Sequence, residues 1–416
     1  MKTLIEDFKK NDLLHYSFQY YSVCVIQVCY FISVEYLHNP YYLILFVYGI
    51  LPVLDIITPT DNKNPSEEDY KVMVKQDRFK IPVYLAIFLC WISYYWSIYK
   101  MLNNDHGLFF TAGILLATIT LEATNFNMAH ELSHKSGFMT KFVGTSSLLK
   151  SFNTHFLIEH NSNHHVWVST PRCTASAKLN QSLFPFILQS MIGGYKHGWE
   201  LENKRCEEAY GTKYSIYNFM FYSTIGCLLF PLTGYLWLGY RATILQIFIG
   251  LTASSFFETI NYIEHYGLKR RFISPTGKYE KVNIQHSWNA PYRISNYLLF
   301  KLQRHSDHHE NALKPYQILS SYEESPYMPQ GYAVCFVIAA IPPIWFEVMN
   351  PLVEIYRRKE KPSKDLLDKL NAIIYKYVFI VNVFFFVLLL VSEGINRKLL
   401  SLDYFGGDMD NFSNVY

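Results

Sequence analysis

The stretch LFFTAGILLATITLEATNFNMAHELSHK, residues 108–135, decides the fold, because a long apolar run leads directly into a histidine motif. Its first part, 108–125, carries a single charged side chain, that of Glu122. A transmembrane helix needs roughly 20 predominantly apolar residues. The run therefore predicts a membrane-spanning helix whose end is followed closely by His130 and His134.

Other apolar runs repeat this pattern along the 416 residues, of which 50% are hydrophobic and only 17% charged. A soluble domain usually has about a quarter of its residues charged. The stretch 334–349 is also apolar, but it contains Pro342 and Pro343, so we expect an interfacial or re-entrant segment there. We predict six spans, and a seventh apolar segment at 373–391 is a further candidate. The six lie at about 16–36, 41–57, 82–101, 108–125, 217–238 and 242–260.

Charge is distributed unevenly around these spans. Short links join the spans in pairs, which predicts three helical hairpins. Of the 37 Lys and Arg residues, 32 fall in the N-terminal tail or in the long polar segments 58–81, 126–216 and 261–372. The positive-inside rule assigns these segments to the cytosol. We thus expect a multi-pass membrane protein with a cytosolic helical cap, in the endoplasmic reticulum of a eukaryote or the inner membrane of a bacterium. If 373–391 spans, the tail 393–416 ends on the opposite side.

Two whole-chain properties limit the classes of function. The net charge of +3 is too small to argue for nucleic acid as a partner. The seven cysteines include no C-x-x-C pair, which argues against a zinc ribbon, a fused rubredoxin or a ferredoxin module.

Nine of the 15 histidines fall in four short motifs: HELSH, EHNSNHH, NYIEHYGL and QRHSDHH. All four motifs lie in the segments predicted to be cytosolic, just beyond or between spans. The nine are His130, His134, His160, His164, His165, His265, His305, His308 and His309.

The spacing of these histidines is typical of metal ligands. Residues three and four apart on a helix share a face. We therefore expect His130 and His134 to point the same way, and likewise His160 and His164. We expect the same of His305, His308 and His309. Neutral imidazole nitrogens bind iron and zinc well. Nine imidazoles are too many for one ion and suit a pair.

Four carboxylates accompany the histidine motifs: Glu131, Glu159, Glu264 and Asp307. A ligating histidine usually donates its second N–H to a carboxylate or a carbonyl, which sets its tautomer. We predict that these four carboxylates orient the metal-binding rings.

At these motifs the chain resembles the membrane alkane hydroxylases, the alkane 1-monooxygenase family within the fatty acid desaturase/hydroxylase group. The strings NMAHELSHK (127–135), EHNSNHHVWVSTP (159–171), NYIEHYGL (261–268) and LQRHSDHHENALKPYQIL (302–319) carry the resemblance, and DIITPTDNKNP (55–65) is similar to the family's first cytosolic loop. The resemblance extends from about residue 40 to residue 350.

The resemblance implies an all-α membrane protein with a six-helix core and a cap that holds two irons through the nine histidines. It also implies O2-dependent hydroxylation, with terminal attack on an alkane or long alkyl chain taken from the bilayer, and electrons from a separate rubredoxin-like or other carrier. A hydroxylase domain would then occupy 1–350, and 351–416 would be an extension past the family's usual end. The chain also departs from the family at Arg172-Cys173-Thr174, where acidic residues and a proline are usual.

Three other classes stay open at this point. HELSH alone is the zinc-protease pattern with Glu131 as general base, although most of the other histidines would then have no task. A metal transporter would place its ligands within the spans rather than beyond them. A desaturase or hydroxylase acting on an acyl lipid or a sterol is the strongest rival, because its iron chemistry begins in the same way.

Overall fold

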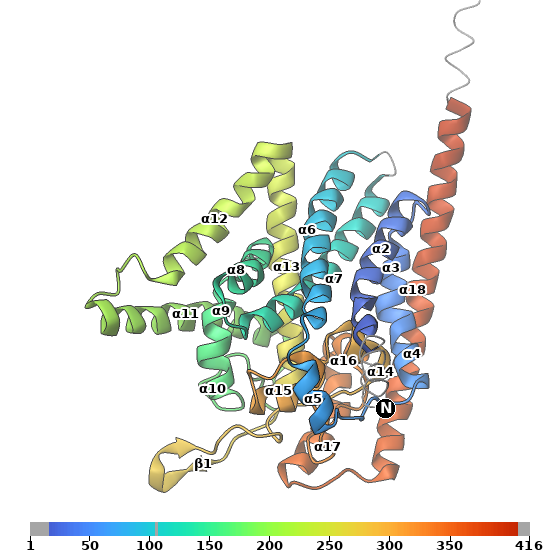
Figure 1. Cartoon of the computed structure of the whole chain (residues 1–416). Helices are drawn as coiled ribbons and strands as arrows, with labels where there is room; N and C mark the ends of the chain where they lie inside the picture. Colours follow the sequence, from blue (N-terminus) through green and yellow to red (C-terminus); the bar gives the residue numbers. More distant parts are fainter. Residues whose placement is uncertain (1–15, 105–106, 407–416) are drawn as a thin grey trace, which may run out of the picture.

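The computed structural model describes residues 16–104 and 107–406, with side chains up to residue 395. Long upright helices form one half of the molecule, and shorter helices and loops form a cap across one end (Figure 1). Helices make up the regular secondary structure of the described part, apart from one short hairpin of β1 (Phe272–Ile273) and β2 (Lys278–Tyr279), around the turn η6 (Ser274–Thr276). The predicted all-α class is confirmed.

Within the described residues, six helices are long and apolar enough to cross a membrane. They begin with η1 (Gln19–Tyr21) and α2 (Ser22–Glu35), which together form the span 16–35. The others are α6 (Ile81–Leu102, preceded by η3, Asp77–Phe79), α7 (Gly107–Ser133), α12 (Phe219–Leu238), α13 (Tyr240–His265) and α18 (Lys364–Gly406).

These six differ from the predicted set in two places. The run 41–57 forms a shorter apolar helix, divided into α3 (Tyr41–Leu45), the π-helical turn η2 (Phe46–Ile50) and α4 (Leu51–Ile57). At 1.5 Å per residue it is about 26 Å long, less than the roughly 30 Å of the hydrocarbon core. The segment at 373–391, by contrast, lies within α18, whose hydropathy of 2.5 is the highest of the six.

Helix α18 packs against the outside of the bundle along α3 and η2. A Cβ atom on Gly49 would lie 2.9 Å from the side-chain oxygen of Asn382, so the two helices are in close contact there. Near the other end, the amide of Asn39 donates to Glu393 (2.8 Å) and the hydroxyl of Ser392 donates to Asn39 (3.0 Å). The C-terminal helix is therefore an integrated part of the bundle.

The hairpins α6–α7 and α12–α13 pack as predicted, and α7 lies against α13. Between them the chain forms α8 (Phe138–Ser147) and η4 (Leu148–Ser151). The ammonium of Lys150 lies 2.7 Å from the carboxylate of Glu122, and both side chains are buried. On the other side, Gly250 of α13 approaches the carbonyl of Lys150 so closely that a Cβ would lie 2.5 Å away. Removing one partner of such a buried pair costs about 3–5 kcal/mol, so η4 is held firmly between α7 and α13.

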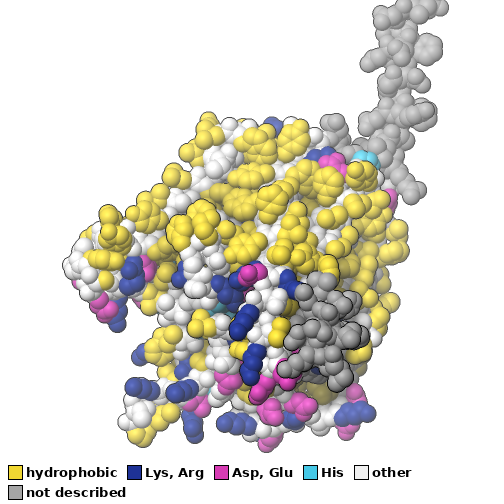
Figure 2. Space-filling model, in the orientation of Figure 1, with side chains coloured by type: hydrophobic (Ala, Val, Ile, Leu, Met, Phe, Trp, Pro, Cys, Tyr) yellow, Lys and Arg dark blue, Asp and Glu magenta, His cyan; other side chains and the backbone are white. Residues whose placement is uncertain are grey.

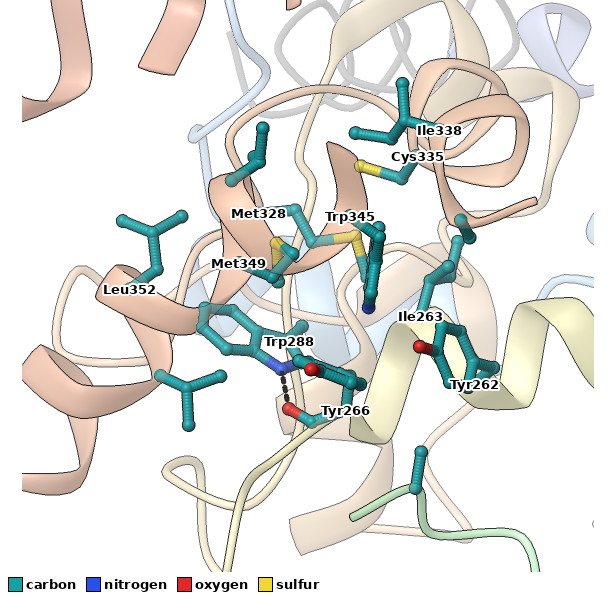
Figure 3. Packing of buried hydrophobic residues seen from close by; sticks show 14 of the residues in the cluster. Tyr262, Ile263, Tyr266, Trp288, Met328, Cys335, Ile338, Trp345, Met349 and Leu352 are labelled. Carbon is teal, nitrogen blue, oxygen red and sulfur yellow. Dashed lines mark hydrogen bonds between the residues drawn. The ribbon is translucent and has the colours of Figure 1, made fainter. Parts of the chain in front are cut away.

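The cap contains the largest buried cluster, where α13 meets α16 (Tyr332–Ala339) and α17 (Pro342–Arg357). Figure 3 shows Trp288 and Trp345 within it, and the indole N–H of Trp288 donates to the carbonyl of Tyr266 (2.9 Å). The segment 334–349 is thus not a span, as expected, because the chain breaks between α16 and α17 just before Pro342.

The other cap elements are α5 (Glu67–Met73), α9 (Phe156–Glu159), η5 (His160–His164), α10 (His165–Trp167), α11 (Leu183–Tyr210), α14 (Arg293–Leu298), α15 (His305–Glu310) and η7 (Tyr316–Ile318).

The surface follows the same division. On the face shown in Figure 2, charged side chains gather over the cap and hydrophobic side chains cover the upright helices. Within the cap, Arg304 is fully buried and donates to the carbonyls of Asp61 (2.8 Å) and Leu319 (2.6 Å). The loop that follows the second apolar run therefore holds the start of α15, where the QRHSDHH motif begins.

Candidate metal centre

The four histidine motifs come from four parts of the chain that meet where the bundle joins the cap. HELSH lies at the end of α7, EHNSNHH along η5 and α10, NYIEHYGL at the end of α13, and QRHSDHH on α15. The structure brings all nine histidines into two groups, within each of which the ligand atoms lie within 4.8 Å of one another.

The first group has five members. The Nε2 atoms of neighbouring rings are separated by 3.0 to 3.4 Å, so that the five imidazoles surround one point. Four of the five side chains are buried, and His165 is partly exposed. The members are His130, His134, His160, His165 and His308.

The second group has four members, and all of them are buried. The Nε2 atom of His305 lies 3.2 Å from that of His265 and 3.0 Å from that of His309. The ring of His164 lies beside those of His265 and His309, with centroids 4.8 and 4.9 Å away.

The grouping differs from the expectation that histidines four apart share a target. His160 joins His165, five residues on, whereas His164 belongs to the other group. The cause is η5, a π-helical turn over 160–164, in which residues five apart rather than four are bonded and aligned. On α15, His305 and His309 face one group and His308 faces the other, so this short helix contributes to both.

Burial keeps these rings neutral. It lowers the pKa of His164 to about 3, because the imidazolium would lose its hydration. The pKa of His160 also falls well below its usual value, first through burial and then through repulsion from His165. A neutral imidazole has a free nitrogen lone pair, which is the form that binds a metal ion.

The geometry fits metal ions. Two nitrogens bound at right angles to one ion, each with a bond of about 2.1 Å, lie about 3.0 Å apart. Distances of 3.0 to 3.4 Å recur around the first group. In the second group, the Nε2 atom of His164 is buried and has no hydrogen-bond partner among the described residues. Without a cation, these converging polar atoms would be costly to bury.

Among the four carboxylates, Glu264 lies nearest the imidazole nitrogens. Its Oε2 atom is 3.2 Å from Nε2 of His305, the nitrogen that faces His265. Its other oxygen accepts a hydrogen bond from the hydroxyl of Tyr332 (2.7 Å). The carboxylate thus lies on the inner side of the second group rather than behind a ring.

The other three carboxylates bond to groups outside the nine histidines. Glu131 pairs with Lys135 (2.7 Å), and Asp307 pairs with Lys314 (2.6 Å) and accepts from the amide of Ser320. Glu159 accepts a hydrogen bond from Asn163 (3.0 Å). Their role in orienting metal ligands stays a prediction.

Three further contacts at the site were not anticipated from the sequence. The sulfur of Cys173 lies 3.2 Å from Nδ1 of His164, and the hydroxyl of Ser287 lies 3.4 Å from Nδ1 of His265. The third is Tyr332 at Glu264. None of the three lies in a histidine motif, so only the folded chain reveals them.

An apolar cavity of about 140 Å³ lies between the helices on the membrane side of the site. Asn127, three residues before His130, and Tyr332, which contacts Glu264, both line it. The described lining contains no charged side chain: it comprises Val23, Ile26, Gln27, Val47, Tyr48, Leu51, Thr120, Leu121, Ala123, Thr124, Asn127, Phe256, Phe257, Ile260, Ser295, Leu299, Leu302, Tyr332, Ala333 and Phe336.

Comparison with known proteins agrees with this arrangement. Residues 106–339 match the family model described as "Fatty acid desaturase". The chain is 36% identical to "Alkane 1-monooxygenase 2" of Alcanivorax borkumensis, over 77% of this chain and 84% of that protein. It is 34% identical to "Alkane 1-monooxygenase 1" of Pseudomonas aeruginosa, with the same coverage.

A more distant relative is the "Xylene/toluene monooxygenase hydroxylase component XylM" of Pseudomonas putida, 23% identical over 80% of this chain and 87% of that protein. The matched region includes all four histidine motifs, and the first two relatives each align along most of their length. The chain therefore belongs to the alkane 1-monooxygenase family of integral membrane proteins, within the larger fatty acid desaturase family.

Proposed function

We propose that this protein is a non-haem di-iron monooxygenase that inserts one oxygen atom of O2 into an unactivated, terminal C–H bond of an alkane or long alkyl chain. The observation that carries the proposal is the convergence of nine neutral imidazoles into two adjacent groups at the end of an apolar cavity. The balanced reaction consumes R–H, O2, two electrons and two protons, and yields R–OH and water.

Each group of histidines would hold one iron. His130, His134, His160, His165 and His308 would bind the first, and His164, His265, His305 and His309 the second. An iron pair held there supplies the reduction of O2 and the oxidising power that breaks a C–H bond. Nitrogen ligands of this kind suit iron.

The cavity would hold the alkyl chain. Its lining presents aliphatic and aromatic side chains with a few hydroxyl and amide groups, and no charged group to pair with a carboxylate. This favours a hydrocarbon over a fatty acid. The chain would enter from the bilayer and extend toward Tyr332 and Asn127, which places one terminal carbon next to the histidines and excludes water around it.

Glu264 would hold and transfer a proton at the site. It lies between the cavity-lining Tyr332 and the inner nitrogen of His305. The Tyr332 hydroxyl holds Oε1 in place, which leaves Oε2 to hold a proton beside the reacting oxygen. Because O2 reduction takes up two protons in a site that excludes water, a group of this kind is needed there.

Electrons would come from a separate carrier, since the sequence contains no C-x-x-C pair for an iron–sulfur or rubredoxin centre. We propose that an acidic rubredoxin-like carrier docks over His165, the most exposed of the nine histidines. Arg172 lies over the ring of Trp167 (4.4 Å), and Arg270 donates to the carbonyl of Val166 (2.7 Å). Two cations therefore flank this part of the surface.

We further propose that the cap lies in the cytosol, because most of the Lys and Arg residues lie on that side of the spans. The membrane would be the endoplasmic reticulum in a eukaryote and the inner membrane in a bacterium. The division into a hydroxylase domain, 1–350, and an extension, 351–416, is part of the same proposal. Helix α17 crosses that boundary, and the turn after it leads into α18.

The experiment is to purify the protein, count its iron, and supply 18O2, an electron donor and a mixture of alkanes and fatty acids. We expect two irons per chain and a primary alcohol that carries one 18O atom. An unlabelled alkene would instead indicate a desaturase, and zinc with peptide cleavage would indicate a protease.

The matched pair of variants is His265→Asn and His38→Asn. His265 belongs to the second group, whereas His38 lies in the link between α2 and α3, outside both groups. We expect the first variant to lose iron and product and the second to keep both. If both variants keep wild-type iron content and alcohol yield, the assignment of the site is wrong.

A further inference from the structure

The loop 168–177 places a sulfur atom against one of the nine histidines. The ring of His164 presents Nε2 toward the second group, and its Nδ1 lies 3.2 Å from the Sγ atom of Cys173. Both side chains are buried. This is the loop whose residues 172–174 depart from the pattern of the family that the sequence resembles.

The position of the sulfur is well defined by the packing of its loop. Gly193 of α11 faces Thr174 so closely that a Cβ would lie 2.4 Å from its methyl group. The amide of Gln189, also on α11, donates to the carbonyl of Thr174 (2.8 Å). At the start of the loop, the hydroxyl of Ser169 donates to the carbonyl of His286 (2.8 Å). The loop is therefore held against α11 and against the segment after α13.

The chemistry of this contact follows from the imidazole. If Nε2 offers its lone pair to a metal ion, the proton of the neutral ring lies on Nδ1. That N–H then donates to the sulfur of Cys173. An outer acceptor sets the orientation of a ligating ring and raises its basicity, and a carboxylate does so strongly. A thiol is a weak acceptor, so it orients the ring while it adds little electron density.

We propose that Cys173 is a positioning residue for the second metal, and that its weak acceptor sulfur tunes the affinity and the reduction potential of the four-histidine group through His164. The inference rests on the proposed function only in taking that group as a metal site. It makes Cys173 one contact by which the four-histidine group differs from the five-histidine group, and it needs no change of charge at the sulfur.

The test compares Cys173→Ala, Cys173→Asp and Cys173→Ser in the full-length protein. Cobalt(II) is the first probe, because its visible spectrum reports ligand geometry whether or not iron is the native metal. We expect Cys173→Ala to weaken binding of one of the two ions by about 10–100-fold. We expect Cys173→Asp to strengthen binding and, in the iron-loaded protein, to lower the reduction potential. A tenfold shift in the preference for Fe3+ over Fe2+ corresponds to about 59 mV.

Cys206→Ser is the matched control, because Cys206 is also buried but lies near the far end of α11. It should leave both ions, the cobalt spectrum and the potential unchanged. Helical circular dichroism and the melting temperature identify any variant that fails to fold, and Cys173→Ser, which retains a small polar acceptor, should keep more affinity than Cys173→Ala. The inference is overturned if folded Cys173→Ala and Cys173→Asp both match wild type in cobalt affinity, spectrum and potential. Failure of wild type to use O2 would overturn the proposed function alone.

Discussion

The two histidine groups use the same ligand type but differ in their surroundings. The five-histidine group includes the partly exposed His165. In each group two Nδ1 atoms have no hydrogen-bond partner among the described residues: those of His134 and His165 in the five-histidine group, and those of His305 and His309 in the four-histidine group. The four-histidine group is fully buried. Cys173 and Ser287 contact the outer Nδ1 atoms of His164 and His265, and Glu264 contacts the inner Nε2 atom of His305.

This difference teaches that two metal sites built from one set of motifs need not be equivalent. A site whose rings are oriented by neighbours loses little freedom when a metal binds, whereas loosely oriented rings must be ordered at that moment. We expect the four-histidine group to hold its metal in a fixed geometry and the five-histidine group to exchange its metal more readily.

The largest effect is expected from removing one histidine from each of the two groups in turn. His305→Ala should lose one iron and reduce hydroxylation by more than about a hundredfold, since loss of an outer partner alone costs roughly 10–100-fold. His308→Ala, one turn away on α15, should lose the other iron and keep the cobalt signature of the four-histidine group. Identical residual spectra in the two variants would show that the groups are not separate.

Removal of metal is the next way to test the comparison. A chelator should extract one equivalent quickly and the second slowly, because only the five-histidine group reaches the surface, at His165. Iron released over time, measured by the colour of the chelate, should follow two phases. A single phase for both equivalents would contradict the difference in accessibility.

Glu264 and Glu131 offer a matched pair of carboxylates. Glu264→Gln replaces the carboxylate beside His305 and should lower turnover by about 10–100-fold with little loss of the fold, because glutamine has nearly the same shape. Glu131 pairs with Lys135 instead, so Glu131→Gln should change turnover only a few-fold. Steady-state turnover rates with one alkane test both variants. Equal losses of turnover in the two variants would contradict a distinct role for Glu264.

The smallest effect is expected at Ser287. Its hydroxyl lies 3.4 Å from Nδ1 of His265, a long and therefore weak contact. Ser287→Ala should weaken metal binding in the four-histidine group by no more than about tenfold. Cobalt titration measures this, and a loss larger than that of Cys173→Ala would reverse the ranking of the two contacts.

Much of this architecture could be predicted from the sequence because apolar length and histidine spacing are local properties. The run 108–125 and the motif after it predicted both a span and two candidate ligands, and the nine histidines identified from their motifs converge. The sequence did not decide whether 373–391, now within α18, spans the membrane, because length and composition alone cannot separate a lipid-facing span from a peripheral helix. Its contacts at Asn382 and Glu393 involve Gly49 and Asn39, over 300 residues earlier in the chain.

The division of the histidines between the groups could not be predicted from spacing. A regular α-helix aligns residues four apart, but η5 is a π-helical turn and aligns His160 with His165. A one-residue insertion of this kind leaves no clear trace in composition. Cys173 was missed for a related reason, since its contact with His164 depends on a loop held by α11, and no repeat in the sequence connects the two.

The course of α18 has a practical consequence for placing the protein in a cell. The helix starts beside the cap and, at Glu393, contacts the link between α2 and α3 at the other end of the bundle. If the cap is cytosolic, as proposed, the residues after α18 would lie on the opposite side of the membrane, and they include the sequon Asn411-Phe412-Ser413. In a host with N-linked glycosylation, a sugar attached to Asn411 would mark the lumenal side, and an enzyme that removes such sugars would shift the protein on a gel.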